Sequence, residues 1–158
     1  MKIKNSKPIE TLRRVMPITY FLTLMALSIF SHFYIPLGKL FYYPVTYIGY
    51  LPLVSGVTLN LWTDRLFKVN DTTVKPHLDP NVLIKSGPFK VSRHPMYLGM
   101  ALVLLGVAVI HGTIISFIYP IIFTVLMEIL FIPVEESKLI KLFGQEYLDY
   151  MKKVRKWV

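Results

Sequence analysis

The stretch from Arg93 to Glu136, RHPMYLGMALVLLGVAVIHGTIISFIYPIIFTVLMEILFIPVEE, decides the fold. It contains two apolar segments, residues 95–111 and 113–133, which meet at the short connection His-Gly-Thr. A helix that crosses the hydrocarbon core of a bilayer needs about 20 apolar residues. The shorter segment is extended at its start by Pro95, a residue that suits the first position of a helix. The pattern therefore predicts two membrane-spanning helices that form a tight hairpin.

Two more apolar segments precede this hairpin, at residues 15–35 and 44–62. The first has no charged residue and is not followed by a small-residue cleavage site, so we interpret it as a retained span rather than a signal peptide. The chain is 54% hydrophobic, which is high for a soluble domain. We therefore expect an all-α, polytopic membrane protein with about four transmembrane helices, in which residues 1–158 form a single domain.

The distribution of basic residues predicts the orientation in the membrane. All but one of the 18 lysines and arginines lie before the first span, between the second and third spans, or after the fourth; the exception is Lys39. Cytoplasmic segments of membrane proteins carry an excess of Lys and Arg. Four spans place the three basic segments on one side, so we expect both termini in the cytoplasm. Topology then explains the net charge of +9, and a nucleic-acid partner is not expected.

The segment after the fourth span has the pattern of an amphipathic helix. Its large apolar side chains recur every three or four residues, at Leu139, Phe143, Tyr147, Tyr150, Val154 and Trp157. Such a helix can lie at the lipid headgroups, or it can pack on the protein's own cytoplasmic connection. Gly144 is expected to bend the helix or to divide it in two.

Arg93 and His94 are the first candidates for a functional role. They precede the third span, follow a turn predicted by Gly-Pro, and lie between the aromatic residues Phe89 and Tyr97. A basic pair at a helix N-terminus beside aromatic rings suits a ligand with a carboxylate and a purine. The plainer interpretation is an arginine that obeys the positive-inside rule and a histidine that satisfies a helix start.

The acidic residues near the end of the fourth span are the second group of candidates. Glu135 and Glu136 lie on the same side of the membrane as Arg93 and His94, so the two ends of the hairpin are expected to meet. Glu128 lies inside the span, where acidic side chains are costly and often functional. Other chemistries are excluded: the chain has no cysteine, no G-x-G motif, no P-loop and no H-E-x-x-H spacing, and no metal site is predicted.

Two ordered motifs resemble a known family. GPFKVSRHPMYLG is similar to the G-P-[FY]-x-x-x-R-H-P-x-Y-x-G signature of the isoprenylcysteine carboxyl methyltransferase family, which is related to the phospholipid N-methyltransferases. EESKLIKLFGQEYLDYMKKV resembles the E-E-x-x-L-x-x-x-F-G-x-E-Y-x-x-Y block of that family. The resemblance implies an integral membrane methyltransferase that uses S-adenosylmethionine and a lipophilic or lipid-modified acceptor from the membrane lipids.

The resemblance also implies where the cofactor binds, in residues of about 72–99 and 128–154. The residues that match the cofactor site are Val82, Leu83, Ile84, Phe89, Arg93, His94, Tyr97 and Glu135. An amine acceptor has to lose a proton before methylation, and Glu135 and Glu128 are the candidate catalytic residues for that step. Where the carboxyl methyltransferases resemble one another in an arginine assigned to the substrate carboxylate, this chain has Phe131. The acceptor is therefore left open between an isoprenylcysteine-like carboxylate and a lipid amine.

A small four-helix, proton-coupled transporter is the alternative function. Four spans and one intramembrane acid are compatible with it. Such a protein would not need a long cytoplasmic connection together with an amphipathic tail, and this argument favours the enzyme.

Overall fold

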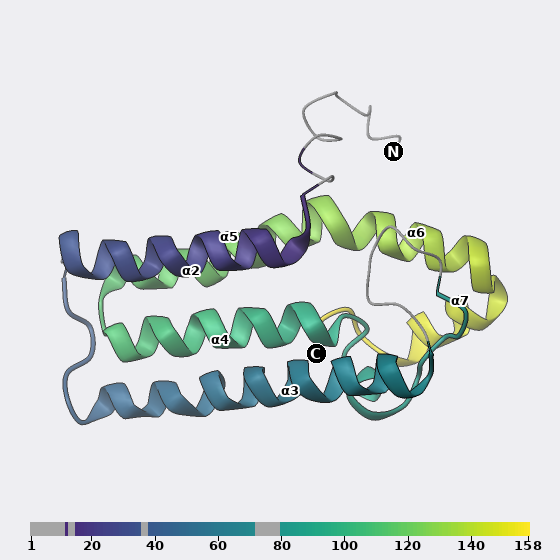
Figure 1. The fold of residues 1–158 in the computed structure, drawn as a ribbon, viewed down its shortest axis with the longest axis horizontal. Helices are drawn as coiled ribbons and strands as arrows, with labels where there is room; N and C mark the ends of the chain where they lie inside the picture. The colour runs from purple at the N-terminus through teal and green to yellow at the C-terminus, as the bar shows by residue number, and fades with distance from the viewer. Residues whose placement is uncertain (1–11, 13–14, 36–37, 72–79) are drawn as a thin grey trace.

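The structure is a computed structural model that describes residues 12, 15–35, 38–71 and 80–158 (Figure 1). Within these ranges it is helical, and its only β-type pairing is an isolated bridge between Lys39 and Thr113. Part of the predicted cofactor region, residues 72–79, lies outside the described residues, as does most of the basic N-terminal segment.

The predicted hairpin is present and its first helix has the expected bounds. Helix α4 (Pro95–His111) starts with a proline at its first position and ends at Gly112, whose φ of 67° is the left-handed conformation that glycine favours. After a short 3-10 helix, η3 (Ile114–Phe117), the chain forms α5 (Ile118–Leu126), a π-helical turn η4 (Met127–Phe131) and α6 (Ile132–Phe143). These four elements make one continuous helix of 30 residues, about 45 Å long at 1.5 Å per residue.

The other two long helices pack on this hairpin from opposite sides. Helix α2 (Pro17–Tyr34) packs on α5, and α3 (Tyr50–Val69), which follows the short 3-10 helix η1 (Val45–Gly49), packs on α4 (Figure 1). The backbones of α3 and α4 are in close contact, since a Cβ atom added to Gly56 would lie 2.4 Å from the carbonyl oxygen of Gly99. The absence of a side chain at Gly56 allows this close approach, and a Cβ atom added to Gly99 would lie 2.4 Å from the side chain of Asn60.

The predicted second span differs most from the structure. We expected a helix over residues 44–62, but the α-helix begins at Tyr50 and continues to Val69. Apolar content marks the segment but not the helix ends. The additional turns contain charged residues, yet Leu66 and Phe67 on the same turns pack against a buried cluster. Packing of those two side chains favours continuation of the helix beyond the apolar segment.

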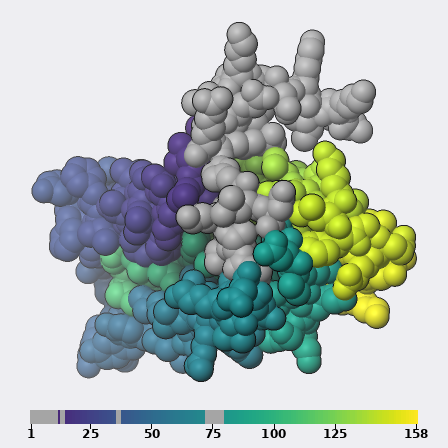
Figure 2. Space-filling model, turned by 45° about the vertical axis from the view of Figure 1, so that its right-hand side comes forward, coloured from purple at the N-terminus to yellow at the C-terminus, as the bar shows by residue number. Residues whose placement is uncertain are grey.

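The amphipathic tail divides at Gly144, as expected. Its second part is α7 (Gln145–Lys153), and Gly144 between the helices has a positive φ of 52°. The side chains of Tyr147 and Tyr150 are buried in a cluster with Ile84 and Phe89 from the connection before α4. Figure 2 shows the residues of α6 and α7 gathered at one end of the molecule, beside residues that precede α4. The apolar stripe of the tail, except for Trp157, therefore packs on the protein's own connection.

Two helices in the described residues are long and apolar enough to span a membrane, α2 and the continuous helix Ile114–Phe143. Helix α4 is also apolar but has 17 residues, and α3 ends in a charged turn that includes an ion pair between Asp64 and Lys68. A four-span arrangement with cytoplasmic termini remains a prediction.

Candidate functional site

The connection before α4 is shaped by a glycine and a serine. Gly87 has a φ of 58° and starts the 3-10 helix η2 (Gly87–Lys90), which buries Phe89. The backbone N–H of His94 donates to the hydroxyl of Ser92 at 3.1 Å, immediately before Pro95 begins α4. This geometry places Arg93 and His94 just outside the first turn of the helix.

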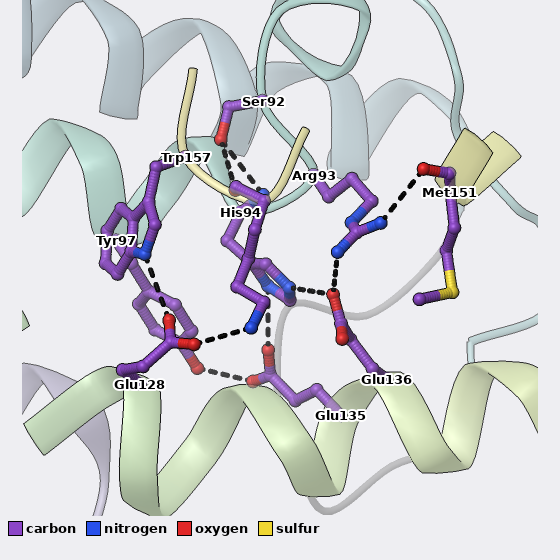
Figure 3. A network of polar contacts seen from close by, with 10 residues as sticks. Ser92, Arg93, His94, Tyr97, Glu128, Glu135, Glu136, Met151 and Trp157 are labelled. Carbon is purple, nitrogen blue, oxygen red and sulfur yellow. Dashed lines mark hydrogen bonds and ion pairs between the residues drawn. The ribbon is translucent and has the colours of Figure 1, made fainter. Parts of the chain in front are cut away.

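The two ends of the hairpin meet through five polar side chains (Figure 3). A guanidinium nitrogen of Arg93 lies 2.7 Å from Glu136, and Nε2 of His94 lies 3.3 Å from the same carboxylate. Nδ1 of His94 lies 3.4 Å from Glu135, which also accepts a hydrogen bond from the hydroxyl of Tyr97. The expected convergence of Arg93 and His94 with the two glutamates is confirmed.

The environment of His94 favours its protonated form. Its side chain is buried, and burial by itself disfavours the charged imidazolium. Hydrogen bonds and Coulomb attraction from Glu135 and Glu136 outweigh this cost and hold the pKa of His94 above its ordinary value. The two carboxylates therefore favour a positive charge on His94 beside the guanidinium of Arg93.

A cavity of about 360 Å³ lies beside this network. All eight residues predicted to bind the cofactor line it: Val82, Leu83, Ile84, Phe89, Arg93, His94, Tyr97 and Glu135. Its volume is in the range of small-molecule sites, and its walls combine apolar and aromatic surface with a few polar groups. The structure thus brings together residues from the connection, from the start of α4 and from α6.

Two tyrosines of α7 also line the cavity, and the sequence-based prediction of the site omitted them. The hydroxyl of Tyr150 donates to the carbonyl of Phe89 at 2.6 Å, and burial raises the pKa of Tyr150 to about 12. The hydroxyl of Tyr147 is buried and has no hydrogen-bond partner among the described residues. Both belong to the apolar stripe of the tail and to its E-Y-x-x-Y motif, which were the available signals.

Apolar side chains form another part of the cavity wall. Met96 and Met100 of α4 contribute to it, together with Met16, Pro17 and Ile18 at the start of α2. Met16 and Ile18 are themselves exposed on the outer surface of the helices. The cavity therefore extends from the charged network to an exposed apolar surface.

Glu128 and Phe131 occupy different surroundings. Glu128 does not line the cavity; its carboxylate lies 2.5 Å from Nζ of Lys156 and accepts a hydrogen bond of 3.0 Å from the indole N–H of Trp157. Phe131 is buried in the core, where its ring meets Tyr20 edge to face with centroids 5.8 Å apart. At this position, where the family resemblance implies an arginine for the substrate carboxylate, the structure places a buried aromatic ring.

A charged and aromatic pocket that opens toward apolar surface, built on a helical hairpin of bilayer length, is typical of a membrane enzyme that brings a polar ligand to a lipophilic one. Comparison with known proteins agrees with this class. The family described as phospholipid methyltransferase matches residues 45–146, which is more than half of the chain, and the chain belongs to that family.

The fold agrees with that of a solved structure. The eukaryotic intramembrane Ras methyltransferase ICMT (isoprenylcysteine carboxyl methyltransferase) superposes with a TM-score of 0.60 at 21% sequence identity. The alignment covers 99% of this chain and 54% of that protein, so the chain spans about half of its length. A comparison of the sequence with curated proteins found no match.

Proposed function

We propose that this protein is an integral membrane methyltransferase that transfers a methyl group from S-adenosylmethionine to a lipophilic acceptor. The observation that carries the proposal is the single cavity that joins the charged network of His94 and Glu135 to the apolar wall at the start of α2. Methyl transfer requires that the polar donor and the apolar acceptor meet, and a cavity with both kinds of wall allows this. The proposal rests on the proposed cofactor residues as well as on family membership.

The residues of the cavity fit the donor. S-adenosylmethionine supplies an activated methyl group on a sulfonium, together with an amino acid portion and an adenine. Arg93 and His94 are cations for its carboxylate, and Glu135 is an anion for its ammonium or sulfonium. Phe89 and Tyr97 offer aromatic faces for the adenine or the sulfonium.

Two buried donors without partners support the presence of a ligand. The hydroxyl of Tyr147 and Nε of Arg93 are buried without a hydrogen-bond partner among the described residues. Burial raises the pKa of Tyr147, so its hydroxyl stays a donor at neutral pH. Because buried donors without partners are costly, a ligand with acceptor atoms would stabilise this site.

The acceptor that the site favours is an amine rather than a carboxylate. Phe131 lies at the position where the family resemblance implies the arginine that binds a substrate carboxylate. An ammonium with a pKa near 10 has to lose a proton before its nitrogen can attack. The carboxylate of Glu135 lies on the cavity wall and would accept that proton.

The transporter alternative is not supported by the surroundings of Glu128. It was suggested by an isolated acid within a span, but this acid is paired with Lys156 and Trp157. The two contacts give this acid a structural role, so its place within the span does not require a transported proton.

Binding of the cofactor product tests the proposal. Purified protein in detergent is titrated with S-adenosylhomocysteine while thermal unfolding is followed. Ligand at 100 times its Kd stabilises the folded state by about 2.7 kcal/mol, which corresponds to a Tm increase of about 5–10 °C for a chain of this size. His94→Ala and Glu135→Ala should each reduce the increase. The absence of any shift at millimolar ligand would contradict the proposed function.

A matched control is available at the other end of the helices. His32 stacks on His111 with ring centroids 4.3 Å apart. The two histidines lie at the C-terminal ends of α2 and α4, whereas the cavity is lined by residues near the starts of these helices. His32→Ala should therefore leave the ligand-induced shift unchanged. Equal losses for His94→Ala and His32→Ala would show that the effect does not come from the site.

Acceptor class is tested with radiolabelled S-adenosylmethionine and two kinds of acceptor. Vesicles that contain a lipid with a primary amine are compared with a prenylated cysteine that has a free carboxylate. We expect transfer to the amine, with a rate that rises with pH as the ammonium deprotonates. Preferred transfer to the carboxylate, with no dependence on pH above 6, would overturn the assignment of the acceptor.

A further inference from the structure

We infer that Glu128 is a positioning residue, which anchors the tail segment (residues 154–158) so that this segment holds Arg93 and His94 in place. The inference rests on the proposed function only in assigning Arg93 and His94 to the cofactor site. It changes the role expected for Glu128, because its carboxylate is outside the cavity and acts through other residues.

The anchor uses both oxygens of the Glu128 carboxylate. Oε1 accepts from Nζ of Lys156 at 2.5 Å, and Oε2 accepts from the indole N–H of Trp157 at 3.0 Å (Figure 3). The indole ring also packs against the buried cluster of α2, α4 and the continuous helix. Glu128 belongs to the π-helical turn η4, a kind of local irregularity that is frequent at functional sites. Two charge-assisted hydrogen bonds thus attach the tail segment to the membrane helix.

The tail segment in turn holds the connection before α4. The backbone N–H of Arg93 donates to the carbonyl of Arg155 at 3.0 Å, and the hydroxyl of Ser92 donates to the carbonyl of Lys156 at 3.0 Å. Ser92 is fully buried and also accepts the backbone N–H of His94 at 3.1 Å. These bonds involve backbone atoms, so they set the position of the connection itself rather than of one flexible side chain.

The network therefore closes on a single helix. Glu135 and Glu136, which face Arg93 and His94, lie on the same continuous helix as Glu128. The connection is held on one side by those carboxylates and on the other by a tail segment that returns to Glu128. Such double support is what keeps ligand-binding groups in a productive geometry, and loss of one support should displace them.

Two variants of Glu128 and one control measure this effect. Glu128→Ala removes both hydrogen bonds, whereas Glu128→Gln keeps one acceptor oxygen and loses the charge. Glu146→Ala is the control, because Glu146 forms an exposed ion pair of 2.6 Å with Lys85 that also joins α7 to the connection without lining the cavity. We expect Glu128→Ala to weaken binding of S-adenosylhomocysteine by about tenfold, Glu128→Gln to weaken it less, and Glu146→Ala to leave it unchanged.

A readout that does not depend on the cofactor is hydrogen exchange without ligand. Loosening of the tail segment frees the backbone N–H of Arg93, so the peptide that contains Arg93 and His94 should exchange at least several-fold faster in Glu128→Ala than in the wild type or in Glu146→Ala. If the wild type does not bind S-adenosylhomocysteine, the proposed function fails while this readout still tests the anchor. Unchanged exchange in Glu128→Ala would overturn the inference.

A thermodynamic cycle separates positioning from a purely structural or catalytic role. Ser92→Ala breaks the path at its other end. In the double variant, the loss of affinity for S-adenosylhomocysteine should therefore be smaller than the sum of the losses in Ser92→Ala and Glu128→Ala. Additive effects would contradict transmission through the tail segment. A fall of kcat in Glu128→Ala with unchanged ligand affinity and unchanged exchange would show a direct catalytic role and overturn the inference.

Discussion

The ion pair between Arg93 and Glu136 allows the sharpest test of how the site is held. The two side chains are 8% and 13% exposed, and the atoms that pair are 2.7 Å apart. Removing one partner of a buried pair leaves an uncompensated charge, which costs about 3–5 kcal/mol. Glu136→Ala should therefore lower the Tm by roughly 6–20 °C in a chain of this size, since 1 kcal/mol corresponds to about 2–4 °C.

The pair between Lys85 and Glu146 provides the comparison. Its atoms are as close, at 2.6 Å, but its side chains are 44% and 56% exposed. Exposed pairs of this kind contribute about 0–1 kcal/mol, so Glu146→Ala should lower the Tm by at most about 4 °C. The assay is thermal unfolding of the purified variants in one detergent without ligand. If both variants unfold at the same temperature, burial does not govern the strength of the Arg93–Glu136 pair and the reasoning is refuted.

Three further predictions concern protonation, the cavity and helix packing. The pKa of His94 is raised in the folded protein, so the stabilisation that comes from its charge is complete below about pH 6.5 and is lost as the pH rises through the folded pKa. The Tm difference between the wild type and His94→Gln should therefore be larger at pH 6 than at pH 9. A Tm difference that does not change with pH would contradict this. Tyr147→Phe removes a buried hydroxyl that has no hydrogen-bond partner among the described residues, so the Tm without ligand should stay equal or rise. The Kd for S-adenosylhomocysteine should increase. An unchanged Kd would exclude a contact between the Tyr147 hydroxyl and the ligand. Gly56→Val should destabilise the protein by about 1–3 kcal/mol because the backbone of α4 is in the way, whereas thermal unfolding of Ser55→Ala, at the exposed neighbouring residue, should match the wild type.

Some helix boundaries could be predicted because local backbone chemistry sets them. Pro95 favours the first position of a helix, and Gly112 allows the left-handed residue that ends one, so the bounds of α4 agree with the expectation. Gly144 separates α6 from α7 for the same kind of reason. The bounds of α3 were not accessible in this way, because packing of Leu66 and Phe67 favours its last turns despite their charged neighbours.

The sequence by itself determined many of the residues that gather at the site, although it did not assign Tyr147 and Tyr150 to it. Two motifs at the facing ends of one hairpin are brought together by its geometry, and all eight residues proposed for the cofactor line one cavity. Only the tertiary structure decided how those residues are partnered. Three features depend on where the tail packs: the pairing of Arg93 with Glu136, the attachment of Trp157 to Glu128, and the hydroxyl of Tyr147, which has no hydrogen-bond partner among the described residues. The physical reason is that periodicity and motifs report on neighbours along one helix, whereas these contacts join segments that are far apart in the chain.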